Sequence, residues 1–84
     1  MGGYAERLDI YEYDKFVKDT KVFLIQNDMS PEDLAYACGY APKTVRNALR
    51  YYDRCSRFMT AMIKDYIERY EERKARNENQ QNQD

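Results

Sequence analysis

The chain has 84 residues, enough for one small domain, because a compact domain usually needs about 50 to 200 residues. Its 14 basic and 15 acidic residues nearly cancel to a net charge of −1, and that total alone argues against a nucleic-acid partner. Histidine is absent, which removes the most common general base at neutral pH, so we expect no enzyme and no cofactor.

The sequence shows no sign of membrane insertion, secretion or metal binding. No apolar run approaches the roughly 18 residues needed to span a bilayer, and the first residues lack the basic and apolar regions of a signal peptide. Cys38 and Cys55 have neither C-x-x-C spacing nor a histidine to complete a zinc site. We therefore expect a soluble, cytoplasmic protein with two buried free thiols, no metal and no membrane partner.

The first predicted helix covers residues 13–27. Its apolar side chains recur at helical spacing and line one face, whereas lysines occupy the opposite face. Residues 1–12 show no firm periodicity and are interpreted as an N-terminal arm, either irregular or with one short helix. The buried face is predicted to consist of Tyr13, Phe16, Val17, Thr20, Phe23 and Leu24.

The second predicted helix, residues 31–38, has clear signals at both ends. The Ser30 hydroxyl can accept a hydrogen bond from the amide of Asp33, and Pro31 stands where a missing N–H group costs nothing. Gly39 is expected to end the helix, because a left-handed residue after the last turn is cheap for glycine.

A third helix is predicted over residues 42–51 and a long one over about residues 56–73, with a break near Asp53. The long helix carries a broad apolar stripe, and the residues from Asn77 onward include nothing apolar to bury. The prediction is therefore an all-α bundle of about four helices over residues 13–76, with a long C-terminal amphipathic helix and a disordered polar tail at residues 77–84.

The two short helices and their glycine turn resemble the helix-turn-helix DNA-binding family, most nearly the Cro and lambda-type repressors. The resemblance covers residues 31–50. Ala35 lies four residues before Gly39, Val45 six after it and Leu49 ten after it. In that family the small residue lets the helices cross closely, glycine makes the turn, and the branched and leucine positions seat the second helix on the core.

The resemblance implies that residues 42–51 form a recognition helix that lies in the major groove of double-stranded DNA. Base contacts are then expected from its outward side chains, among which Arg46 can form bidentate hydrogen bonds to guanine N7 and O6. The expected base contacts are Lys43, Arg46, Asn47 and Arg50, and the expected backbone contacts are Thr44, Tyr40, Tyr51, Arg54 and Arg57.

The distribution of charge supports this interpretation better than its total does. Residues 41–64 carry a net charge of +5, whereas residues 1–40 carry −4 and residues 65–84 carry −2. The positive charge is thus concentrated in the predicted recognition helix and the residues that follow it, as expected of a surface that contacts DNA.

The sequence predicts a small sequence-specific transcriptional regulator, such as a repressor, of bacterial, phage or mobile-element origin. One helix-turn-helix unit covers half a site, so a homodimer is expected. The apolar stripe of the long helix is wide enough to serve the core on one side and a partner on the other, and the expected interface is Met62, Tyr66, Ile67 and Tyr70, the last three of which extend past the small domain. The alternative is a helix-turn-helix fold that binds a protein partner as an inhibitor or adaptor. The near-neutral total charge favours that alternative.

Overall fold

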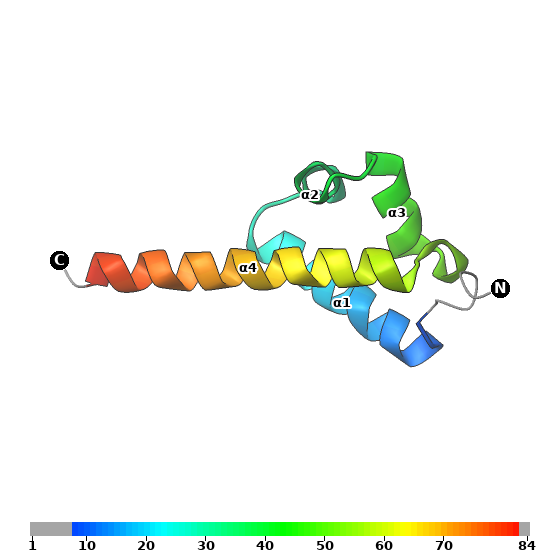
Figure 1. Ribbon diagram of the computed structural model, residues 1–84, viewed down its shortest axis with the longest axis horizontal. Coiled ribbons are helices and arrows are strands. Elements are labelled where there is room, and N and C mark those ends of the chain that lie inside the picture. Colours follow the sequence, from blue (N-terminus) through cyan, green and yellow to red (C-terminus); the bar gives the residue numbers. More distant parts are fainter. Residues whose placement is uncertain (1–7, 83–84) are drawn as a thin grey trace.

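The computed structural model describes the backbone of residues 8–82 and the side chains of residues 8–77. The described chain is all-α, as predicted. Figure 1 shows α4 running along the whole molecule, with α2 and α3 on one side of it and the start of α1 on the other. The elements are α1 (Ile10–Gln26), α2 (Pro31–Cys38), α3 (Pro42–Arg50), a short 3-10 helix η2 (Tyr52–Arg54) and α4 (Arg57–Asn82).

The core lies where the four helices meet. Each helix contributes one of the largest fully buried side chains, because each has a stripe of apolar residues at helical spacing. The predicted inward face of α1 is confirmed except at Val17, which is half-buried against the core. These fully buried side chains are Phe16 of α1, Leu34 of α2, Val45 of α3 and Ile63 of α4, and Thr20 of α1 is fully buried beside them.

Helix α1 begins three residues earlier than predicted. The Asp9 carboxylate accepts a hydrogen bond from the Glu12 amide at 2.9 Å, and the Glu12 carboxylate accepts one from the Asp9 amide at 3.2 Å. This reciprocal capping satisfies two amides that would otherwise lack partners, so the helix can start at Ile10. The predicted arm is therefore wrong for residues 10–12, and residues 1–7 lie outside the described part of the chain.

The predicted start of α2 is confirmed. The Asp33 amide donates to Ser30 Oγ at 3.1 Å, and the Ser30 amide donates to the Asp33 carboxylate at 3.1 Å. Helix α1 ends at Gln26, and Asp28 in the link that follows has a φ of 56°. The link between the two helices therefore consists of residues 27–30 alone.

The predicted break near Asp53 is also confirmed, since η2 separates α3 from α4. Ser56 caps the start of α4, where its Oγ accepts from the Met59 amide at 3.0 Å. Thr60 is buried and donates to the Ser56 carbonyl at 2.9 Å, and it lies 3.3 Å from the Cys55 thiol. Cys55 is buried as predicted, whereas Cys38 is half-buried; both thiols are free.

Helix α4 is longer than the sequence predicted. It continues to Asn82, so the prediction of disorder from residue 77 is wrong for residues 77–82, and residues 83–84 lie outside the described part. No glycine or proline follows Pro42 to stop it, and extending an existing helix gains one hydrogen bond per added residue. Lys74 also ties α4 to the end of α1, because its Nζ donates to Asn27 Oδ1 at 3.2 Å.

Candidate nucleic-acid interface

The turn between α2 and α3 depends on the backbone conformation of Gly39. Its φ is +83°, in the left-handed region, and no atom lies within 4 Å of the position that a Cβ would occupy. Glycine is therefore required by the torsion angle and not by lack of space. The Tyr40 amide donates to the Ala35 carbonyl at 2.9 Å and the Gly39 amide to the Tyr36 carbonyl at 3.3 Å, which closes the end of α2.

Tyr40 faces inward, contrary to its predicted role. Its side chain packs against the core, and its hydroxyl is buried with no hydrogen-bond partner among the described residues. Burial raises the pKa of this hydroxyl above its ordinary value. The prediction that Tyr40 contacts a DNA phosphate is therefore wrong for this conformation. An apolar contact from the residue after the glycine commonly accompanies this type of helix end.

Helix α3 buries one face and exposes the other, as the periodicity predicted. Val45 and Ala48 are completely buried and Leu49 is 6% exposed. The predicted contact residues of the helix lie on the outer face. Four of them are exposed, namely Lys43, Thr44, Arg46 and Arg50, and Asn47 is half-buried.

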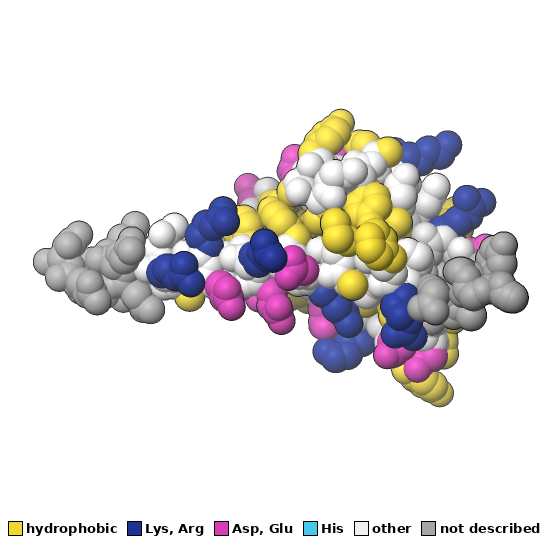
Figure 2. Space-filling model, viewed as in Figure 1, with side chains coloured by type: hydrophobic (Ala, Val, Ile, Leu, Met, Phe, Trp, Pro, Cys, Tyr) yellow, Lys and Arg dark blue, Asp and Glu magenta, His cyan; other side chains and the backbone are white. Residues whose placement is uncertain are grey.

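Three cations on or near this face have no acidic partner among the residues that the structure describes. Lys43, Arg50 and Arg54 are exposed and form no ion pair within the described part of the chain. In Figure 2, dark blue side chains project from the end of the molecule that carries α3, whereas dark blue and magenta side chains are interspersed over α4 and α1. The exposed face of α3 can therefore attract an anionic partner.

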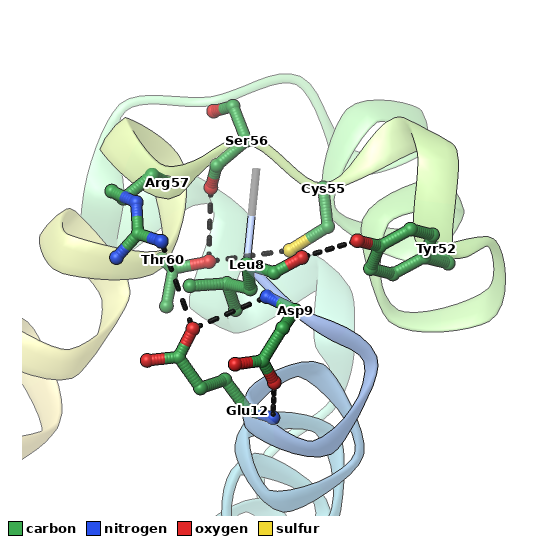
Figure 3. A network of polar contacts seen from close by, with 8 residues as sticks. All are labelled: Leu8, Asp9, Glu12, Tyr52, Cys55, Ser56, Arg57 and Thr60. Atoms are coloured by element: carbon green, nitrogen blue, oxygen red, sulfur yellow. Dashed lines mark hydrogen bonds and ion pairs between the residues drawn. The ribbon is translucent and has the colours of Figure 1, made fainter. Parts of the chain in front are cut away.

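The other two predicted arginine contacts are paired with glutamates. The Arg46 guanidinium on α3 donates to the carboxylate of Glu32 in the first turn of α2. The Arg57 guanidinium at the start of α4 lies 3.6 Å from the Glu12 carboxylate, which also caps α1 (Figure 3). The sequence could not reveal these pairs, because each joins two different helices.

A hydrogen bond that the sequence did not predict anchors the end of α3. The buried Tyr13 hydroxyl of α1 donates to the Ala48 carbonyl at 2.8 Å. The Tyr13 ring packs edge-on against Tyr52, with centroids 5.4 Å apart, and the Tyr52 hydroxyl donates to the Leu8 carbonyl (Figure 3). Burial, as the largest cause, raises the pKa of Tyr13. The signal available in the sequence was a tyrosine on an apolar face, since a buried hydroxyl usually needs a partner.

Most of the predicted dimer surface packs within the chain. The Phe23 ring lies edge-on to Tyr66 and Tyr70, at centroid distances of 6.3 and 5.3 Å, and Ile67 also packs against the core. The expectation that these three residues extend beyond the domain is therefore wrong. These side chains of α4 cover the C-terminal half of α1, because α4 is long enough to lie alongside it. Of the predicted set, Met62 remains outside at 41% exposed.

A groove of about 670 Å³ runs between α1 and α4. Phe16, Phe23 and Ile67 lie along it, and lysines alternate with acidic residues around it, so the groove selects neither sign of charge. Among the described side chains, no group of three or more cysteines or carboxylates could hold a metal ion. Within residues 8–82, no helix combines the length and apolar character needed to cross a bilayer.

Comparison with known proteins gives one short likeness. A stretch of 31 residues, 37% of this chain, is 52% identical to part of the major DNA-binding protein of Psittacid herpesvirus 1. The chain covers 3% of the length of that viral protein, too little to assign it to the same family. No protein-family model and no solved structure matches the chain.

Proposed function

We propose that this chain is a sequence-specific DNA-binding protein that acts as a small transcriptional regulator of the kind carried by bacteria, phages or mobile elements. The observation that carries the proposal is the outer face of α3. Lys43 and Arg50 project from it without an acidic partner in the described part of the chain, while the opposite face of the same helix packs on the core. The resemblance of residues 31–50 to Cro and lambda-type repressors and the short likeness to a viral DNA-binding protein support it.

In this proposal α3 lies in the major groove, where its N-terminal half reaches base edges. Arg46 contacts guanine, and Lys43 and Asn47 contact neighbouring purines. Polar and basic side chains of α3 and of the residues after it hold phosphates and so fix the position of the helix on the duplex. The phosphate contacts are Thr44, Arg54 and Tyr51, which is 48% exposed. Arg57, which the sequence also predicted here, adds little because it is paired with Glu12.

The proposal includes a homodimer, because one such unit covers half a site and two units together multiply affinity and specificity. With Tyr66 and Tyr70 engaged in the core, the exposed apolar residues at the start of α4 form the interface. These are Phe58, 70% exposed, and Met62, one helical turn later.

Selection of bound duplexes from a random pool, followed by titration of the recovered duplex at several salt concentrations, tests the proposal. Arg46→Ala should weaken binding to the recovered duplex by about 1 to 3 kcal/mol. Arg54→Ala should weaken binding to every sequence and reduce the salt slope by about 0.9. Lys18→Ala, which removes an exposed cation of α1 beside the groove, is the matched control and should change neither. Failure to bind any duplex at low salt would overturn the proposal.

A protein partner is the second candidate, and the exposed apolar surface favours it. Tyr36 on α2 is 71% exposed, and Phe58 on α4 is exposed to a similar extent. Such side chains supply contact area in protein interfaces. A complex captured from host lysate that survives nuclease and high salt would support an inhibitor or adaptor, because phosphate contacts weaken steeply as salt rises.

A further inference from the structure

The Glu32–Arg46 pair joins the two helices of the proposed DNA-binding unit. Glu32 lies in the first turn of α2, and Arg46 lies in the middle of the outer face of α3. Both side chains are accessible to solvent, at 38% and 52% exposed. The contact runs from one guanidinium nitrogen to one carboxylate oxygen, so other N–H groups of Arg46 remain available for a second partner.

Glu32 is held in its charged form. The hydrogen bond from Arg46 is the largest cause that lowers the pKa of its carboxyl group below the ordinary value of 4.5, and a backbone hydrogen bond acts in the same direction. The position in the first turn of α2 also favours a negative charge there. At neutral pH the positive charge of Arg46 is therefore balanced by a carboxylate before any DNA arrives.

This balance affects phosphate contacts and base contacts differently. A free cation that meets a phosphate displaces a condensed counterion, which drives binding to any sequence, whereas an arginine already neutralised by a carboxylate gains little from a phosphate. A guanine edge offers two acceptors at a fixed spacing. A guanidinium that is already held in one orientation loses less side-chain conformational entropy when it binds them.

We infer that Glu32 is a specificity-determining positioning residue. It holds the Arg46 side chain over the outer face of α3 and weakens the binding of Arg46 to the phosphates of unrelated sequences. The inference rests on the proposed function, because it assigns a task to Arg46 at that same surface. Glu32 itself need not touch DNA.

The test is Glu32→Gln, which keeps the length of the side chain and removes its charge. Two duplexes serve as probes: the one recovered by selection and a scrambled duplex of the same composition. Releasing Arg46 should steepen the salt slope on the scrambled duplex by about 0.9, an extra factor of about 3.5 in affinity for each fourfold dilution of salt. Discrimination between the two duplexes should fall by a similar factor at low salt.

Two controls separate this role from a general effect of charge. Asp53→Asn removes an exposed carboxylate that forms no ion pair within the described residues, so it should strengthen binding to both duplexes equally and leave the discrimination unchanged. In an Arg46→Ala background, Glu32→Gln should no longer steepen the salt slope. Thermal melting of each variant checks that the fold is retained, because Ser30, which caps α2 through Asp33, also hydrogen-bonds to the Glu32 carboxyl group.

The outcomes distinguish this inference from the proposed function. Wild-type protein that selects a duplex, together with a Glu32→Gln variant of unchanged slope and discrimination, overturns the inference and leaves DNA binding intact. Equal effects of Glu32→Gln and Asp53→Asn on discrimination also overturn it. Wild-type protein that binds no duplex overturns the proposed function and, with it, the inference.

Discussion

The hydrogen bond from Tyr13 to the Ala48 carbonyl should be a major support of α3. Removing the hydroxyl in Tyr13→Phe leaves that carbonyl unpaired in the last turn of α3. The amide of Tyr51, three residues later, cannot replace the hydroxyl because it already donates to the Asn47 carbonyl. Tyr13 is 7% exposed, so water cannot readily replace the lost partner. Leaving a buried acceptor unsatisfied costs about 1 to 3 kcal/mol.

Thermal and urea unfolding of the wild-type and Tyr13→Phe proteins measures this cost. In a domain of this size each kcal/mol lowers the melting temperature by about 4 to 8 °C. Tyr11→Phe is the matched control, because Tyr11 lies on the same helix but is 82% exposed, and its change should leave the melting temperature unaltered. If Tyr13→Phe melts together with Tyr11→Phe, the bond to Ala48 does not stabilise the fold.

Three further outcomes follow from particular residues. Gly39→Ala should lower the free energy of unfolding by about 1 kcal/mol through backbone strain at positive φ, and Gly39→Asn should recover part of it in urea titrations. Ser30→Ala should cost about 0.5 to 2 kcal/mol through loss of the α2 cap, whereas Ser30→Gly should cost only a few tenths. Stability should hold up to about pH 8 and fall above pH 9, which urea midpoints under reducing conditions can check. Burial raises the pKa of cysteine thiols and tyrosine hydroxyls in the folded protein above their ordinary values of 9.0 and 10.0. As the pH rises, the unfolded chain therefore loses these protons before the folded protein does, which favours unfolding. Unchanged stability up to pH 11 would contradict this expectation. The groups concerned are Tyr13, Tyr40, Tyr66, Cys38 and Cys55.

The boundaries of α2 and α3 could be predicted because their signals are local. Ser30 caps α2 through an amide three residues away, and Gly39 ends it through its own torsion angle. The start of α1 was equally local, since Asp9 and Glu12 form the same kind of reciprocal cap, and this signal in the sequence was missed. The end of α4 had no such signal, because a polar helix without glycine or proline carries no mark of where it stops.

The partners of the site residues could not be predicted from the sequence. Periodicity identified the inner and outer faces of α3, and the structure confirms that Val45 is buried on the inner face while Arg46 is exposed on the outer face. It could not show that Glu32, 14 residues earlier, reaches Arg46, because that contact depends on how α2 crosses α3. The inward turn of Tyr40 has the same origin, since the closure of the α2 end directs that side chain onto the core.

Two contacts hold α3 in place, and their environments assign them different tasks. The Tyr13–Ala48 bond is buried and neutral, so its loss should lower stability while leaving discrimination between duplexes unchanged. The Glu32–Arg46 pair is exposed and charged, and exposed pairs contribute little to stability, so its loss should change discrimination and leave the melting temperature nearly unaltered. Measuring both quantities on Tyr13→Phe and Glu32→Gln therefore separates support of the helix from control of its arginine. If both variants lower melting temperature and discrimination together, the pair acts by stabilising the fold and not by positioning Arg46.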